Sequence, residues 1–207
     1  MARFVLVHGA WHGSWCFRYL VEELEDRGHE AVAVDLPCDE VGLELHDHAA
    51  VVGPQPDAVV VGHSFGAQTV ALVPARLRVY LAGVLPVESP ARECFRPEFS
   101  GTLRDELGRS YWPDADICAA KMYPDCTRAQ SDWAYAQLRR QAQVATAAAP
   151  FGKGDIVLAT MRDATVDGEW QVRTAKARGA RVIELDTGHS PFFTQPDELA
   201  DVLDGLA

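Results

Sequence analysis

Ser64 stands at the centre of the run GHSFG at residues 62–66, which matches the pattern G-x-S-x-G. The apolar run at 58–61 predicts a buried strand before it, and residues 67–72 predict a helix directly after it. A serine between a strand and a helix occupies a sharp turn, where its hydroxyl can act as a nucleophile. The two glycines fit this turn because a Cβ there would collide with the neighbouring strand or helix. The alternative is an ordinary strand-to-helix turn with a capping serine.

His189 is the candidate base that such a nucleophile requires. A serine hydroxyl reacts poorly at neutral pH unless a base lies within hydrogen-bond reach. Of the seven histidines in the sequence, His189 is the one that follows Ser64 along the chain. It lies in the run DTGHSP at 186–191, directly after a predicted strand at 182–185. This places His189 at the carboxyl edge of a parallel sheet, where ligands bind in open α/β folds.

The carboxylate that would orient this base has more than one candidate. Asp163 follows the predicted strand at 156–161 by two residues and therefore lies at the same carboxyl edge. Asp167 is the alternative on position, whereas Asp155 precedes the strand and lies at the opposite edge. Asp186 is so close to the histidine along the chain that we expect it to stabilise a turn. We predict that Asp163 is the acid.

Two backbone N–H groups are candidates for an oxyanion hole, which would stabilise negative charge during acyl transfer. Phe65 follows the serine and supplies one, and Ala10, in the loop HGAWHGSW at 8–15, supplies the other. The alternative is that this loop is only a strand-ending turn.

Six short apolar runs predict the strands that position these loops, and runs of this kind are typical of strands buried on both faces of a sheet. They lie at 3–7, 31–36, 58–61, 79–84, 156–161 and 182–185. Helical patterns alternate with them at 17–27, 46–52, 67–72, 169–178 and 196–206. This alternation predicts an α/β fold with a doubly wound, mostly parallel six-stranded sheet.

The segment at 86–150 differs from the rest of the chain because it is polar, irregular and richer in Trp and Tyr. We predict that 1–207 is a single domain in which this cap segment is inserted between core segments 1–85 and 151–207. It would form a small helical cap over the site, with a helix at about 128–148. Candidate substrate contacts are Trp11, His12, Trp112, Met122, Tyr123 and Trp133. The alternative is that these side chains form core.

The composition restricts the partners and the location of the protein. Its 207 residues carry a formal net charge of −11 without clustered basic residues, which argues against nucleic acid or an anionic membrane as partner. Five cysteines without C-x-x-C spacing predict reduced thiols, and no signal peptide or bilayer-spanning run is apparent, so we expect a cytoplasmic protein. No His, Cys and Asp cluster suggests a metal, and we expect no cofactor.

Three motifs together resemble the α/β-hydrolase superfamily: FVLVHGAWHGSW at 4–15, GHSFG at 62–66 and GHSPFF at 188–193. The resemblance is nearest to the branch of plant methyl esterases and hydroxynitrile lyases, which includes small bacterial carboxylesterase-like proteins. It implies a shortened α/β-hydrolase fold with Asp163 as the catalytic acid. The lyases of this branch carry a lysine near the catalytic histidine, which this sequence lacks, and this difference disfavours cyanohydrin chemistry.

These features predict a serine hydrolase that cleaves a small, largely apolar carboxylic ester, thioester or lactone through a Ser64–His189–Asp163 triad. The alternatives are a lyase or a cofactor-free oxygenase on the same scaffold, or a ligand-sensing protein that retains the triad. We expect the partner to be a small-molecule ester. The sequence is compatible with a homodimer.

Overall fold

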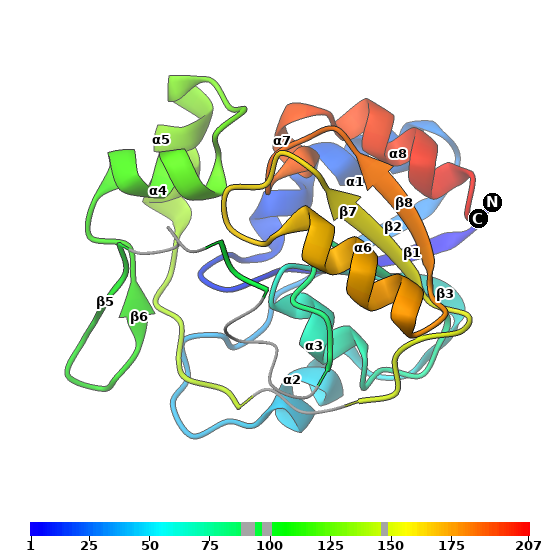
Figure 1. Ribbon diagram of the computed structural model, residues 1–207, viewed down its shortest axis with the longest axis horizontal. Coiled ribbons are helices and arrows are strands. Elements are labelled where there is room, and N and C mark those ends of the chain that lie inside the picture. Colours follow the sequence, from blue (N-terminus) through cyan, green and yellow to red (C-terminus); the bar gives the residue numbers. More distant parts are fainter. Residues whose placement is uncertain (88–93, 97–100, 146–148) are drawn as a thin grey trace.

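A computed structural model describes residues 1–87, 94–96, 101–145 and 149–207 (Figure 1). Its centre is a sheet of six strands, all paired in parallel, in the order β2-β1-β3-β4-β7-β8. The strands are β1 (Arg3–Val7), β2 (Glu30–Val34), β3 (Gln55–His63), β4 (Ala75–Leu81), β7 (Ile156–Thr160) and β8 (Arg181–Leu185). The predicted α/β fold with a mostly parallel six-stranded sheet is therefore confirmed.

Helices cover both faces of this sheet, as Figure 1 shows. They are the 3-10 helix η1 (Ser14–Phe17), α1 (Arg18–Asp26), α2 (Leu45–Val52), α3 (Gly66–Val70), α6 (Gly168–Ala177), α7 (Pro191–Thr194) and α8 (Pro196–Asp204). In β1, Phe4 and Leu6 pack in one apolar cluster with residues of α1 and α8, whereas Val5 and Val7 pack in another with residues of α2 and α3. Successive side chains of a strand point to opposite faces, so a strand buried on both sides must be apolar throughout.

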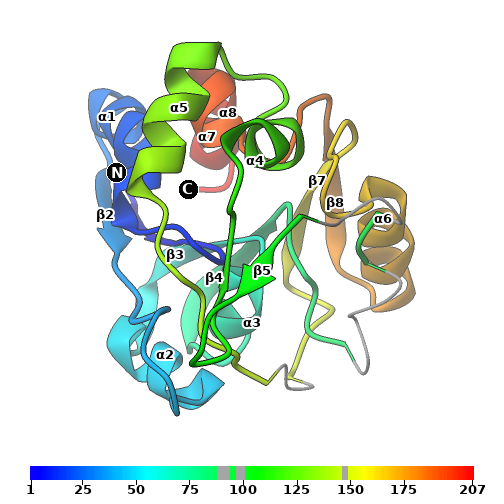
Figure 2. The same cartoon turned by 90° about the vertical axis from the view of Figure 1, so that its left-hand side faces the viewer.

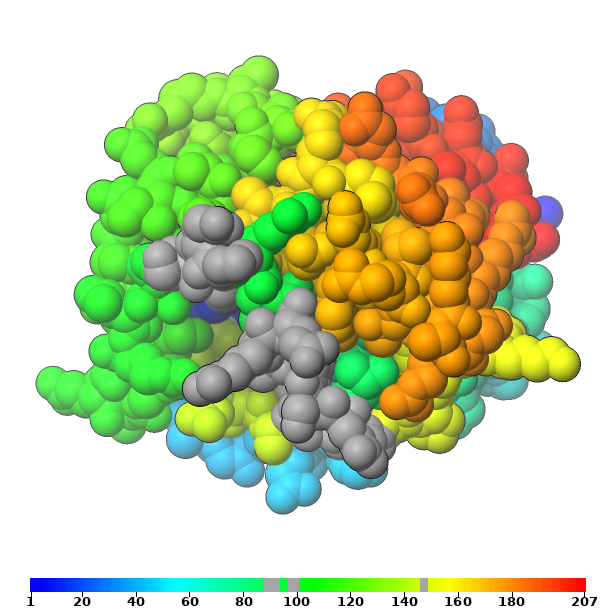
Figure 3. All heavy atoms as spheres, in the orientation of Figure 1, coloured from blue at the N-terminus to red at the C-terminus, as the bar shows by residue number. Residues whose placement is uncertain are grey.

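The cap segment lies outside this sheet, between β4 and β7 along the chain. Its described elements are β5 (Leu103–Arg104), β6 (Ser110–Tyr111), α4 (Ala115–Met122) and α5 (Arg128–Gln137). Figure 2 shows α4 and α5 together at one side of the molecule, with β5 below them. Figure 3 shows the cap (green) packed directly against the part of the core that contains β7 and α6 (orange).

The predicted helix at 128–148 is wrong in length. The helix α5 begins at Arg128, where Thr127 forms a capping box with Gln130, and it ends at Gln137. Leu138 has extended backbone angles, and the chain then runs back along the core, where Arg139 N–H donates to Trp11 O at 2.8 Å. Tertiary hydrogen bonds here override the helical tendency of the sequence. Residues 146–148 of the predicted helix lie outside the described residues.

Glycines at 62 and 66 allow the turn at the end of β3, as predicted. A Cβ on Gly66 would lie 2.5 Å from the His8 carbonyl oxygen and 2.7 Å from that of Val7. A Cβ on Gly62 would lie 2.8 Å from the Gly66 carbonyl oxygen. Real Cβ atoms do not approach backbone so closely, so any larger residue would push α3 away from β1.

Replacing Gly66 with Ala should therefore destabilise the protein by about 2–3 kcal/mol, because the added methyl group must displace backbone atoms rather than a side chain. Chemical denaturation measures this change. Gly205→Ala is the matched control, since a Cβ there meets nothing closer than 3.5 Å, and it should change the free energy of unfolding by less than about 0.5 kcal/mol. Equal stability of the two variants would contradict the account of this turn.

Candidate active site

Ser64 occupies the apex of the turn between β3 and α3 in a left-handed backbone conformation, with φ of 51°. Hydrogen bonds hold this conformation in place: Ser64 N–H donates to Leu81 O at 3.0 Å, and Ser64 O accepts from Val84 N–H at 3.0 Å. A left-handed non-glycine residue costs of order 1–3 kcal/mol unless its surroundings determine it, and such residues cluster at active sites. The hydroxyl is almost buried, with 6% of the residue exposed, and it lines a cavity.

His189 and Asp163 form a fully buried pair. The Nδ1 atom of His189 lies 2.7 Å from Oδ2 of Asp163, and neither side chain is exposed. The imidazole Nδ1–H therefore donates to the carboxylate, which fixes the tautomer and leaves Nε2 as the basic nitrogen. The structure thus brings together two residues that are 26 positions apart in sequence.

Asp163 is held by three further hydrogen bonds. Its Oδ2 accepts from the Thr160 hydroxyl at 2.8 Å, and its Oδ1 accepts from the backbone N–H of Thr165 at 2.7 Å and of Val166 at 3.0 Å. A buried carboxylate needs such donors, because an unpartnered charge is costly in the interior. These bonds fix the plane in which the carboxylate meets His189.

The other candidate acids make different contacts. Asp167 caps the N-terminus of α6 by accepting from Trp170 N–H at 2.9 Å. Asp155 pairs with Arg78 at 2.9 Å, at the amino end of β7. Asp186 is exposed and pairs with Arg162 at 2.9 Å. Each of these three carboxylates therefore has a structural role away from His189.

The hydrogen bond between Ser64 and His189 is not formed in this structure. The Nε2 atom of His189 is buried and has no hydrogen-bond partner among the described residues. A change of the Ser64 side-chain rotamer is only a small movement. Catalytic hydrogen bonds of unliganded enzymes often tighten only when substrate binds. The Asp163–His189 pair is thus assembled, whereas its contact with Ser64 is not.

The predicted oxyanion-hole residues, Ala10 and Phe65, line the same cavity as Ser64. Within the described part of the chain, neither backbone N–H donates a hydrogen bond. Gly9 lets the loop after β1 approach this point, because a Cβ on Gly9 would lie 2.8 Å from Cβ of Ser64. Two unused donors beside a serine hydroxyl are what a developing oxyanion requires.

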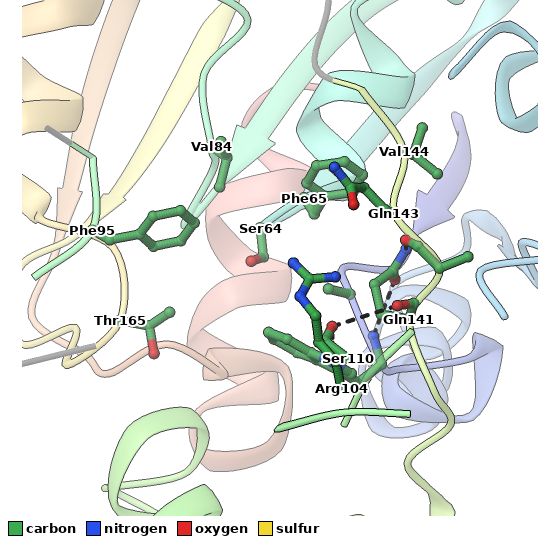
Figure 4. A pocket seen from close by; sticks show the side chains of 13 residues that line it. Ser64, Phe65, Val84, Phe95, Arg104, Ser110, Gln141, Gln143, Val144 and Thr165 are labelled. Carbon is green, nitrogen blue, oxygen red and sulfur yellow. Dashed lines mark hydrogen bonds between the residues drawn. The ribbon is translucent and has the colours of Figure 1, made fainter. Parts of the chain in front are cut away.

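The cavity beside Ser64 has a volume of about 250 Å³ and is open to solvent on one side (Figure 4). Its lining is mostly apolar with a few polar groups, as is usual for sites that bind small molecules. The described lining residues are Ala10, Trp11, Ser64, Phe65, Val84, Phe95, Arg104, Ser110, Gln141, Ala142, Gln143, Val144 and Thr165.

Of the predicted substrate contacts, Trp11 lines this cavity, and the other five do not. Trp112 packs edge-on against Trp11, with ring centroids 5.4 Å apart, and so lies behind the wall. Met122 is 1% exposed and accepts a weak hydrogen bond from Thr165 through its sulfur. Trp133 packs on Trp15 at the far side of the cap segment, with ring centroids 5.4 Å apart. Trp112 and Met122 are therefore buried in the core, and Trp133 is half-buried against it.

His12 and Tyr123 form a buried polar contact instead of touching substrate. Burial lowers the pKa of His12 to about 3, so the imidazole is neutral. Its Nδ1–H donates to Ala10 O at 2.8 Å, and its Nε2 accepts from the Tyr123 hydroxyl at 2.8 Å. The ring thus connects the cap segment to the loop that presents Ala10. Burial likewise lowers the pKa of His8 to about 4.

The cap segment also holds the loop that carries His189. The Asp125 carboxylate accepts from Gly188 N–H at 2.7 Å and pairs with Arg162 at 3.2 Å. The Ser190 hydroxyl donates to Met122 O at 2.7 Å. His63 Nε2–H donates to the backbone oxygen of His189 at 3.0 Å, and burial keeps the pKa of His63 well below its usual value. Hydrogen bonds from the cap segment and from His63 therefore fix the position of the His189 loop.

Within the described residues, no group of three or more His, Cys, Asp or Glu side chains could hold a metal ion. No helix in the same part of the chain is long and apolar enough to cross a membrane.

A model of the alpha/beta hydrolase family matches residues 4–202. The chain belongs to this family. The resemblance drawn from the three sequence motifs is therefore confirmed.

Curated relatives of this chain include synthases and esterases. Norfluorocurarine synthase 1 from Strychnos sp is 29% identical over 172 residues, covering 66% of this chain and 65% of that protein. Carbendazim hydrolyzing esterase from Nocardioides sp. (strain SG-4G) is 30% identical over 127 residues, covering 55% and 50%. Probable esterase PIR7A from Oryza sativa subsp. indica is 38% identical over 124 residues, covering 50% and 47%. The chain thus spans about half to two thirds of the length of these relatives.

Solved structures extend the likeness over the full chain. Polyneuridine aldehyde esterase aligns with a TM-score of 0.76 at 19% identity, covering 100% of this chain and 99% of that chain. The pyrethroid hydrolase PytH aligns with a TM-score of 0.77 at 17% identity, covering 99% and 97%. At these identities the likeness shows a shared fold.

The contacts of the two carboxylates predict different outcomes for Asp163→Asn and Asp167→Asn. Asp163→Asn should lower kcat for ester hydrolysis by about 10⁴-fold, because an amide cannot hold His189 in the required tautomer. Asp167→Asn keeps an N-cap side chain and should retain kcat within about twofold, with unfolding curves of both variants as the control. Loss of activity in Asp167→Asn alone would show that the wrong acid is chosen here.

Proposed function

We propose that this hydrolase cleaves a small, largely apolar carboxylic ester by acyl transfer to Ser64. One observation carries the proposal. The buried pair of Asp163 and His189 lies at the same edge of the sheet as Ser64, which is held in a left-handed conformation beside two unused backbone N–H donors. No simpler role explains an imidazole that is oriented by a carboxylate and has a buried, unpartnered Nε2.

The proposed reaction begins when Ser64 rotates toward His189, and Nε2 takes the hydroxyl proton as the oxygen attacks the substrate carbonyl. Asp163 stabilises the imidazolium that forms. The backbone N–H groups of Ala10 and Phe65 donate to the oxyanion of the tetrahedral intermediate. His189 then gives its proton to the leaving alcohol, and water repeats the sequence on the acyl-enzyme. Thioesters and lactones are cleaved by the same steps.

Several relatives agree with ester cleavage, since three of them are named as esterases. The size and lining of the cavity favour a small substrate with an apolar part. The alternatives, a lyase, a cofactor-free oxygenase or a ligand-sensing protein, share the scaffold but differ in product. A ligand sensor would label slowly at Ser64 and show no steady-state turnover.

Ser64→Ala should lower kcat for 4-nitrophenyl butyrate by about 10⁴- to 10⁶-fold, because it removes the hydroxyl that forms the proposed acyl-enzyme. Initial rates of nitrophenol release measure this. Ser131→Ala is the matched control, since that hydroxyl lies in α5 and donates to Arg128 O, and it should leave kcat unchanged. A Ser64→Ala variant with full activity would refute the proposal.

A further inference from the structure

Arg104 is the one charged residue among the described residues that line the Ser64 cavity. It belongs to the short strand β5 in the cap segment, and Figure 4 shows its side chain extending into the cavity that Ser64 also lines. The protein as a whole is acidic, with a formal net charge of −11. The Arg104 guanidinium therefore makes this cavity positive although the protein as a whole is negative. A positive group in the cavity that Ser64 lines would attract an anion.

The guanidinium of Arg104 is not neutralised within the described residues. Its Nη1–H donates to Gly108 O at 2.6 Å, and it forms no ion pair in the described part of the chain. The neighbouring carboxylate of Asp105 pairs instead with Arg109 at 2.9 Å and with Arg140 at 3.5 Å. Arg104 thus retains donors for a carboxylate, which a guanidinium can bind through two parallel N–H groups.

The Ser110 and Gln141 side chains, which line the same cavity, are already engaged in hydrogen bonds. The Ser110 hydroxyl accepts from Trp11 Nε1–H at 3.1 Å and donates to Gln141 O at 3.4 Å. The Gln141 amide accepts from Trp11 N–H at 3.4 Å and donates to Ala142 O at 2.9 Å. These bonds build the wall of the cavity, and among the described lining residues Arg104 is the charged group able to bind a carboxylate.

The cavity has two unlike sides, which Figure 4 shows on either side of Ser64. Val84, Phe95 and Thr165 lie on one side, and Arg104 lies on the other with Gln141. Thr165 donates its N–H to the carboxylate that orients the catalytic histidine, so it marks the histidine side.

The leaving alcohol must lie on the histidine side, because it receives its proton from that ring. The acyl group then extends toward Arg104. We propose that Arg104 is a specificity-determining residue that binds a carboxylate at the far end of the acyl group, so that half-esters of short dicarboxylic acids are preferred substrates. This inference rests on the proposed ester hydrolysis at Ser64.

A matched pair of esters tests this inference: mono-4-nitrophenyl glutarate and 4-nitrophenyl valerate, which differ in the terminal carboxylate. In the wild type, kcat/KM should be about two- to fivefold higher for the glutarate, the range expected for a charged pair near the surface. Arg104→Gln should abolish this preference, and Arg104→Lys should keep part of it. The preference should also fall as the salt concentration rises.

Arg76→Gln is the matched control, because it removes one exposed positive charge at the amino end of β4, far from the cavity. In this variant, the ratio of kcat/KM for the glutarate to kcat/KM for the valerate should equal that of the wild type. Both esters are measured on the same preparation, so a change in the amount of folded enzyme cancels in the ratio. Turnover of the valerate without a glutarate preference, or a preference that survives Arg104→Gln, would overturn this inference alone. Absence of turnover with either ester would refute the ester hydrolysis itself.

Discussion

The close approach of backbone at the turn around Ser64 is the constraint on which the site depends. Gly66 packs against the carbonyl oxygens at the end of β1, and Gly9 packs against Ser64 itself. This contact brings the loop after β1 and Ser64 together, with no side chain between them. The left-handed conformation of Ser64 is kept because hydrogen bonds to the end of β4 and the segment after it hold it from the other side.

The cap segment forms a fixed wall of the site because buried and charged contacts join it to the core. Arg139 donates to the backbone oxygens of Leu36 and His12 at 3.0 Å each and pairs with Asp35 at 3.1 Å. Asp125, between α4 and α5 of the same segment, holds the histidine loop. A wall that is anchored on both sides of α5 presents its cavity in a largely preformed shape, which lowers the entropy cost of binding a substrate.

Site residues that follow a recognisable local sequence pattern could be predicted from the sequence. Cavity-lining residues whose position depends on tertiary packing could not. Ser64 and His189 each follow an apolar run directly, so strand periodicity places them at one sheet edge. Tyr123 and Trp133 looked like pocket residues, but which face of a cap helix meets the cavity depends on tertiary contacts that have no local pattern. Arg104 lies on a strand of two residues, too short to produce any periodicity.

The acyl-enzyme at Ser64 is the central claim, and acid-quench mass spectrometry tests it most directly. The protein is mixed with 4-nitrophenyl butyrate, whose activated leaving group makes deacylation the slow step, and is quenched in acid and digested. We predict one butyryl group on the peptide that contains Ser64, and none on that peptide in Asp163→Asn at the same early time. Nitrophenol release without a butyryl group on Ser64 would contradict the account.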